Sequence, residues 1–196
     1  MTHTDFALWL ERCRAGDPEA VEALFATHQP AVFRLAVSIL DDPAEADEAA
    51  QETFLAVLRA LPSYRGDAAF DTWLYRIAVN VCRGRLRRGR TWQRLKDALQ
   101  AAWRLTGDAA EQPEAAAERG ETQAAVWRAV QALGEKHRLP VILRYYHGLT
   151  TAEIAQVLAV NEGTVHSRLS IARDRLRLAL RGEIALAPSE REANEP

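Results

Sequence analysis

The stretch GLTTAEIAQVLAVNEGTVHSRLSIARDRLRLAL, residues 148–180, contains the clearest structural signals in the chain. Thr150 and Glu153 form a T-x-x-E capping box, which opens a helix because each side chain satisfies a backbone N–H group of the first turn. The Ala-Val pair at 159–160 then fits a tight turn, and Asn161 is a suitable N-cap for a second helix. Apolar residues recur at helical spacing on both sides of the turn, so the stretch predicts a helix-turn-helix.

The second helix of this pair presents a polar surface that suits duplex DNA. Val165, Leu169 and Ala172 are spaced to pack inward. The residues between them therefore face outward, where a helix in the major groove meets base edges and phosphates. The predicted contacts are Thr164, His166, Ser167, Arg168, Ser170 and Arg173. An ordinary helical hairpin with solvated arginines is the alternative for this segment alone, because capping boxes and apolar stripes are common.

The stretch FDTWLYRIAVNVCRGRLRR, residues 70–88, places aromatic and basic side chains on one predicted helix. Aromatic rings can stack on unpaired bases while cations hold phosphates, and each stacked base contributes about 1 to 3 kcal/mol. A nucleic-acid face is favoured for Arg76, Asn80 and the arginines after them, and such a helix suits single-stranded DNA. The core is favoured for four residues at helical spacing, Phe70, Trp73, Leu74 and Ile77.

The remaining sequence predicts an all-α fold. Apolar residues recur at helical spacing almost everywhere, and no alternating run of β-branched residues stands out. Asp17 followed by Pro18 predicts the start of a long helix, and the Asp-Asp-Pro sequence at 41–43 predicts its end.

Composition divides the chain into two small helical domains. A stretch rich in alanine and glutamate separates them, so we predict domains at 1–95 and 121–182, an acidic linker at 96–120 and a frayed tail at 183–196. One helical face near the start of the linker carries Trp92, Leu95, Leu99 and Trp103. Such an apolar stripe is expected to dock on another surface.

Overall composition limits the classes of function. The 196 residues are 48% hydrophobic, enough for a core, and the formal net charge is −2. A protein held by phosphates alone usually has a basic excess, so the position of the charges matters more than their sum. Cys13 and Cys82 lie far apart without neighbouring ligands, which argues against a disulfide framework or a metal site. Without a secretion signal or a run of about 18 uninterrupted apolar residues, we expect a cytoplasmic protein with no membrane insertion and no cofactor.

The order and spacing of these stretches resemble the extracytoplasmic-function sigma factors, which are bacterial transcription initiation factors. The N-terminal half is similar to sigma region two through AVFRLAVSIL (31–40), AQETFLAVLRAL (50–61) and FDTWLYRIAVN (70–80). The C-terminal half is similar to region four through VILRYYHGLTTAEIAQVLAVNEGTVHSRL (141–169). The resemblance covers most of the chain. It implies a non-enzymatic protein that binds core RNA polymerase and directs promoter-specific initiation.

The resemblance also implies where partners bind. The β′ clamp coiled coil would dock on Asp47, Glu48, Gln51 and Glu52, although an isolated acidic run is more often a solvated face. The melted minus-ten element of promoter DNA, with one base flipped into a pocket, would contact Tyr64, Arg65, Tyr75, Arg76, Asn80, Arg83, Arg87 and Arg88. The helix-turn-helix would read the minus-thirty-five element, and its surroundings would contact the β flap. An anti-sigma factor is a further partner, and the protein would be nucleoid-associated in the holoenzyme.

The chain departs from the family pattern at several positions. Alanines at 49–50 replace an aliphatic pair, so the clamp contact is expected to be shallower. Ala159 stands at a turn position where glycine is usual, which is strained if the backbone is left-handed. Ile171 replaces a frequent arginine, and Glu162 would either repel phosphate or accept a hydrogen bond from cytosine.

Two other functions fit parts of the sequence. A stand-alone helix-turn-helix regulator would bind duplex DNA without polymerase, but it leaves the QETF and WLYRIAVN segments without a role. An enzyme would draw its catalytic groups from His3, His28, His137, His147 and His166. These histidines lack HExxH spacing, and the chain has no glycine-rich phosphate loop or GxSxG elbow, so an enzyme is not expected.

Overall fold

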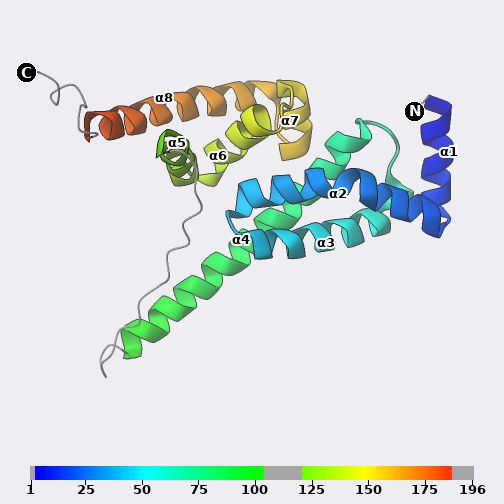
Figure 1. Ribbon diagram of the computed structural model, residues 1–196, viewed down its shortest axis with the longest axis horizontal. Helices are drawn as coiled ribbons and strands as arrows, with labels where there is room; N and C mark the ends of the chain where they lie inside the picture. Colours follow the sequence, from blue (N-terminus) through cyan, green and yellow to red (C-terminus); the bar gives the residue numbers. More distant parts are fainter. Residues whose placement is uncertain (1–2, 104–120, 187–196) are drawn as a thin grey trace, which may run out of the picture. The chain divides into compact units, whose positions relative to one another are not determined.

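A computed structural model describes the backbone of residues 3–103 and 121–186, and the side chains of residues 6–89 and 123–181. Every regular element in these ranges is a helix, so the predicted all-α fold is confirmed. The chain forms two units, the first built mainly from α1 to α4 and the second from α5 to α8 (Figure 1).

Capping residues set the helix boundaries of the first unit. Asp17 accepts hydrogen bonds from the backbone N–H groups of Glu19 and Ala20, with a proline at the first helical position of α2. The left-handed residue Asp41 ends α2, and Asp42 caps α3. Both predicted boundaries of the long helix are confirmed. The elements are α1 (His3–Arg14), α2 (Pro18–Leu40), α3 (Pro43–Ala60), the 3₁₀-helix η1 (Leu61–Ser63) and α4 (Phe70–Trp103).

Helix α2 forms the centre of the first unit and packs against α1, α3 and α4. Its buried face includes Leu24, Val32, Leu35 and Ile39. Within the described part of the chain, α2 is also the one helix that is long and apolar enough to cross a membrane. A core helix has the same composition, and the apolar face of α2 is covered by its neighbours, so we assign α2 to the core.

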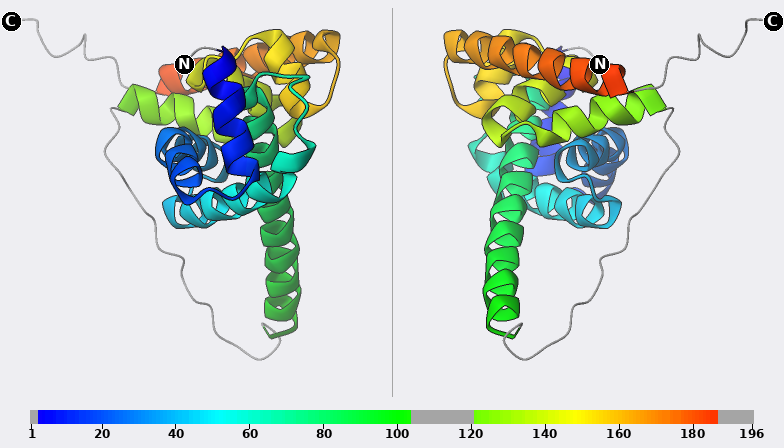
Figure 2. Two further views of the ribbon diagram at one scale, coloured as in Figure 1. Left: turned by 90° about the vertical axis from the view of Figure 1, so that its right-hand side faces the viewer. Right: turned by 90° about the vertical axis from the view of Figure 1, so that its left-hand side faces the viewer.

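Helix α4 is an unbroken helix of 34 residues. Figure 2 shows that it continues beyond the ends of α2 and α3. It therefore includes residues 96–103, which the sequence assigned to the start of the linker. Residues 104–120 and the side chains of the Trp92 and Trp103 stripe lie outside the described residues.

The second unit packs along one side of a long helix. Helix α8 packs along α5 and α6, and its inward residues Val165, Leu169 and Ala172 are buried as the spacing predicts. The predicted tail overlaps the last turn of α8, and residues 187–196 lie outside the described residues. The elements are α5 (Glu121–Ala132), α6 (Glu135–Val141), the π-helix η2 (Ile142–Tyr146), α7 (Thr151–Leu158) and α8 (Glu162–Leu186).

Candidate nucleic-acid and partner-binding surfaces

The helix-turn-helix is held by short-range hydrogen bonds. The backbone N–H of Thr150 donates to the Glu153 carboxylate at 2.7 Å, and the Glu153 N–H donates to the Thr150 hydroxyl at 3.2 Å. The predicted capping box is therefore confirmed. The hydrogen bond with the Thr150 hydroxyl, together with that from its N–H, lowers the pKa of Glu153.

The turn and the start of α8 also follow the sequence prediction. Ala159 has a φ of 53°, which is the left-handed backbone conformation expected where glycine is usual. Asn161 caps α8, because its side-chain oxygen accepts hydrogen bonds from both the N–H and the hydroxyl of Thr164, each at 2.7 Å. This cap fixes the first turn of the helix that is predicted to enter the major groove.

The predicted duplex contacts lie on the outer side of α8. His166, Ser167, Ser170 and Arg173 are exposed, and Thr164 and Arg168 are half-buried. The backbone carbonyl of Arg168 lies 3.4 Å from Nδ1 of the buried His137 on α6. Because a carbonyl only accepts, this nitrogen is the donor.

The buried side chain of His137 has a structural role in the second unit. Burial is the main cause that lowers its pKa. Its contact with the α8 backbone ties α6 to the middle of α8. This gives a packing role to one of the histidines that we weighed for catalysis.

One face of α4 gathers half of the residues that we predict to contact unpaired DNA. Arg76, Asn80, Arg83 and Arg87 follow each other at spacings of four, three and four residues, so they share a helix face. Three of them are exposed, and Arg83 is half-buried. Tyr75 lies beside this face and is also half-buried, and burial raises the pKa of its hydroxyl.

Arg85 points the other way, toward α3. Its guanidinium donates to the carboxylates of Glu45 at 2.8 Å, Glu52 at 3.2 Å and Glu48. The Arg85 side chain is only 15% exposed. Burial alone would lower its pKa, but the hydrogen bonds with the three carboxylates outweigh burial and raise it. Sequence reasoning grouped Arg85 with the other arginines of α4 and missed this role.

The four predicted clamp residues already interact with neighbours. Glu48 and Glu52 bind Arg85, and the Gln51 side chain donates to Asp47 at 2.9 Å. Glu52 also accepts from Arg88, at 3.3 Å. Arg88, which we predicted as a DNA contact, thus lies next to the predicted clamp surface, away from the face that carries Arg76 and Asn80.

The loop between η1 and α4 contains two predicted DNA contacts, of which one is exposed and the other is buried. Arg65 is exposed, as a DNA contact requires. Tyr64, in contrast, is only 8% exposed, and its ring packs against Phe70 and Trp73. Its hydroxyl donates to the carbonyl of Ala68 at 2.7 Å. In this structure Tyr64 supports the loop and does not face outward with Arg65.

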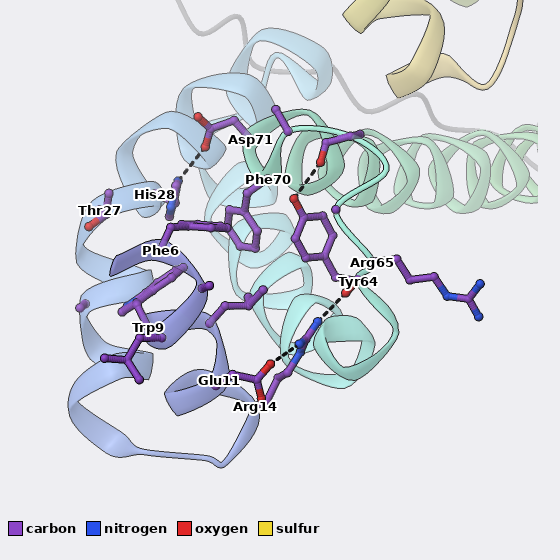
Figure 3. A pocket seen from close by; sticks show the side chains of 17 residues that line it. Phe6, Trp9, Glu11, Arg14, Thr27, His28, Tyr64, Arg65, Phe70 and Asp71 are labelled. Carbon is purple, nitrogen blue, oxygen red and sulfur yellow. Dashed lines mark hydrogen bonds and ion pairs between the residues drawn. The ribbon is translucent and has the colours of Figure 1, made fainter. Parts of the chain in front are cut away.

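A groove lies between this loop, α1 and α2 (Figure 3). Its walls include the aromatic rings of Phe6, Trp9 and Phe70. At one side, Nδ1 of His28 on α2 lies 3.2 Å from the carboxylate of Asp71 on α4, and the hydrogen bond from His28 holds the pKa of Asp71 below its usual value. The groove opens beside the exposed part of the loop.

The described part of the chain contains neither a metal-binding cluster nor a reactive cysteine. No group of three histidine, cysteine or acidic side chains gathers there in a way that could hold a metal ion. Cys13 and Cys82 are both buried and unlinked. Burial raises the pKa of the Cys82 thiol to about 12, so it stays protonated.

Comparison with known proteins identifies the family. Residues 24–93 match Sigma-70 region 2, and residues 123–176 match Sigma-70 region 4. The chain is 39% identical to the RNA polymerase sigma-H factor of Pseudomonas aeruginosa over 176 residues, which cover 87% of this chain and 91% of the relative. It is 36% identical to the ECF RNA polymerase sigma-E factor of Escherichia coli over 170 residues, 84% of this chain and 88% of the relative. The chain belongs to the extracytoplasmic-function sigma factors.

Solved structures of sigma factors share its fold. CnrH in complex with the cytosolic domain of CnrY is 25% identical, with a TM-score of 0.64, and covers 89% of this sigma factor and 96% of CnrH. The sigma factor RpoE from Bartonella quintana, bound to the anti-sigma factor NepR, is 21% identical with a TM-score of 0.60 over 82% of this chain and 96% of RpoE.

Family membership decides between the functions that the sequence left open. This sigma factor directs promoter-specific transcription by RNA polymerase in the bacterial cytoplasm. Sigma factors are non-enzymatic initiation factors. The stand-alone regulator is not favoured, because it would not explain the region 2 match at residues 24–93.

Proposed function

We propose that this sigma factor docks on core RNA polymerase through α3, reads the upstream promoter element with α8, and opens the downstream element on α4 and the loop before it. The observation that carries the proposal is the presence of regions 2 and 4 in one chain, each with an exposed polar surface. The upstream element is the minus-thirty-five element, and the downstream element is the minus-ten element.

Upstream reading is assigned to the outer side of α8. His166, Ser170 and Arg173 share one helix face, with Ser167 and Arg168 beside it. Arginine and histidine can donate to the acceptors of guanine in the major groove, and serine can bind a base or a phosphate. The hydroxyl of Thr164 already donates to the cap, so we assign it an accepting role only.

Downstream melting is assigned to the face of Arg76, Asn80, Arg83 and Arg87, together with Arg65 on the loop. Arginines hold the phosphates of the unpaired strand, and the aromatic groove beside the loop is proposed to receive the flipped base. Unstacking one base costs a few kcal/mol. A pocket that binds the flipped base selects sequence and stabilises open DNA at the same time.

Polymerase docking is assigned to the acidic side of α3. Asp47 and Glu48 are exposed, and Gln51 lies between them and Glu52 on the same helix. The β′ clamp coiled coil is the proposed partner, and region 4 is proposed to contact the β flap. In the holoenzyme the protein would be associated with the nucleoid.

A protein inhibitor of the anti-sigma class is a further proposed partner. CnrH, which shares the fold, was solved with the cytosolic domain of CnrY. The stripe of Trp92 and Trp103 on α4 is a candidate surface for such a partner, with packing inside the chain as the simpler alternative. No membrane insertion is proposed.

Run-off transcription tests the proposal. Genomic fragments are transcribed by bacterial core polymerase with and without the sigma factor, and DNA binding by the sigma factor alone is measured in parallel. Specific transcripts that need both components are expected. Tight specific binding of duplex DNA without polymerase, and no transcript, would contradict the proposal and support a stand-alone regulator.

Two single substitutions then separate the proposed surfaces. Arg168→Ala is expected to weaken use of the upstream element by about 1 to 3 kcal/mol if it makes a bidentate base contact. Arg177→Ala is the control, because it removes an arginine of α8 that is not among the predicted base contacts, and it should leave discrimination among upstream elements unchanged. Asn80→Ala is expected to impair opening more than polymerase binding, and a template with a premelted downstream element should restore its activity.

A further inference from the structure

Arg14 in α1 contacts the backbone at the start of the DNA-reading loop. Its Nε donates to the carbonyl of Leu61 at 3.2 Å, and its Nη2 donates to the carbonyl of Tyr64. Its Nη1 donates to Glu11 at 2.6 Å, one turn earlier in α1. Figure 3 shows the guanidinium between the Glu11 carboxylate and the backbone oxygen of Tyr64. One arginine thus binds two carbonyl groups that lie about fifty residues away in the sequence.

These carbonyls are where a positive charge is most effective. Leu61 is the C-cap of α3 and Tyr64 is the C-cap of η1, so both carbonyls lie at helix C-termini. The Leu61 carbonyl also accepts the backbone N–H of Tyr64 at 3.2 Å, and Arg14 adds a charged donor to it. Hydrogen bonds from a charged donor are about twice as strong as neutral ones, and the C-terminal end of a helix carries partial negative charge. The planar fork of arginine can donate to both carbonyls at once, which the single ammonium group of lysine cannot do in the same fixed geometry.

The other end of the loop is fastened by Tyr64. The hydroxyl of Tyr64 binds the carbonyl of Ala68, while its ring is buried against Phe70 and Trp73. Between the two fastened ends, Arg65 and Asp67 are exposed. The loop therefore presents its polar side chains from a backbone that is fixed on both sides.

Helix α1 is itself firmly attached to the first unit. The rings of Phe6 and Trp9 both pack against Phe70, with centroids 5.7 and 5.8 Å apart. The thiol of Cys13 lies 3.3 Å from the carbonyl of Ala20 in α2. Because α1 ends before residue 24, it lies outside the region 2 match, so its contact with the loop is not part of the matched segment.

We propose that Arg14 is a positioning residue for promoter reading. It holds the loop at residues 64–69 in the conformation that contacts unpaired DNA, so Arg14 acts on downstream discrimination through the backbone of the loop. This inference rests on the proposed role of the loop in downstream melting. The side chain of Arg14 is 26% exposed, and each of its three nitrogens donates to one acceptor, as a positioning role requires.

The test measures promoter discrimination by the reconstituted holoenzyme. Transcription is compared between the promoter found by run-off and variants changed in either the downstream or the upstream element. Arg14→Gln is expected to lower discrimination among downstream variants about tenfold, the factor that corresponds to about 1.4 kcal/mol. Discrimination among upstream variants and affinity for core polymerase should not change. Arg14→Lys should recover part of the loss, because it keeps the charge near both carbonyls.

Arg12→Gln is the matched control. It removes an arginine from the same helix, but its partners Asp17 and Glu19 lie away from the loop. It is expected to leave downstream discrimination unchanged. Tyr64→Phe, which removes the hydrogen bond at the other end of the loop, should lower downstream discrimination in the same direction as Arg14→Gln. Hydrogen exchange of the loop amides in the full-length protein should become faster in both variants.

The outcomes are distinct. Equal losses at upstream and downstream variants, or a loss of polymerase affinity, would show a general folding defect and overturn the inference. Unchanged downstream discrimination in Arg14→Gln, with a clear defect in Asn80→Ala, would overturn the inference and leave the proposed function standing. If Asn80→Ala also leaves both promoter opening and downstream discrimination unchanged, the downstream element binds elsewhere and both proposals fall.

Discussion

The two DNA-reading regions of this sigma factor are stabilised over very different distances in the sequence. In the helix-turn-helix, the decisive hydrogen bonds join residues three positions apart, Thr150 with Glu153 and Asn161 with Thr164. In the first unit, Arg85 reaches Glu45 across 40 positions, and Arg14 reaches Tyr64 across 50. A hydrogen bond between residues three positions apart can form as soon as its helix forms. A hydrogen bond between residues 40 or 50 positions apart forms only when the helices of the first unit have packed together. Substitutions should therefore have larger and less local effects in the first unit.

The largest effect is expected from the long-range bonds. Arg85→Gln leaves three carboxylates of α3 without their shared cation, so their mutual repulsion acts at a partly buried position. We expect a loss of about 2 kcal/mol in the free energy of unfolding, below the 3–5 kcal/mol typical of a fully buried pair, because the carboxylates are partly exposed. Urea unfolding of the full-length protein measures it. Arg88→Gln, which removes a single exposed bond to Glu52, should cost less than about 0.5 kcal/mol; equal losses in both variants would refute the central role of Arg85.

A smaller effect is expected from the cap of the recognition helix. Asn161→Ala removes the acceptor for the N–H and the hydroxyl of Thr164. Loss of such a cap costs about 1 kcal/mol. Asn161→Ser should retain most of the stability, because serine is also a good N-cap. Hydrogen exchange resolves the two units, and faster exchange in the first unit as well would contradict the local character of this bond.

The capping box predicts a weaker, pH-dependent effect. Hydrogen bonds from Thr150 hold the pKa of Glu153 below its ordinary value in the folded protein. The carboxylate therefore stabilises the fold above its unfolded pKa of about 4.3, and this contribution is lost as the pH falls through the lower folded pKa. Glu153→Gln should cost about 0.5 kcal/mol at neutral pH, and the difference from the unsubstituted protein should shrink with acidification. A difference that stays constant between neutral pH and pH 3 would show that the charge contributes nothing.

An effect of similar size but opposite sign is expected at the turn. Ala159→Gly relieves a left-handed conformation that costs a residue with a β-carbon about 1 to 2 kcal/mol. Glycine also loses about 0.5 to 1 kcal/mol through its greater freedom in the unfolded chain, so we expect a net gain of about 0.5 kcal/mol. Ala152→Gly, on the exposed side of α7, should instead destabilise the unit. Thermal unfolding compares the two variants, and a loss in Ala159→Gly would mean that the left-handed backbone carries no strain.

The same contrast explains what the sequence could predict. The boundaries of α2, the capping box and the cap at Asn161 each depend on a few consecutive residues, so their chemistry is visible without the fold. The burial of Tyr64 could not be predicted, because its ring is covered by Phe70 and Trp73 only once the loop has folded back. The resemblance to the family had placed Tyr64 among the DNA contacts.

Arg85 could have been found from spacing. Leu74, Ala78 and Cys82 repeat at intervals of four on the buried face of α4, and Arg85 continues that face three residues later. An arginine at an inward position needs an acidic partner, and α3 supplies acids at the spacing of one helix face. What the sequence lacks is the angle at which α3 and α4 pack, which decides whether those acids come within reach.

The unbroken course of α4 restricts how this protein can vary in length. Each residue inserted into an α-helix turns everything beyond it by about 100°. A single insertion between Asn80 and Arg85 would rotate Arg85 away from α3, or else rotate the side chains that we propose to contact DNA away from their common face. Insertions and deletions should therefore be tolerated in evolution at the ends of this helix and not within it. Changes of three or four residues are the exception, because they nearly restore the direction in which the following side chains point.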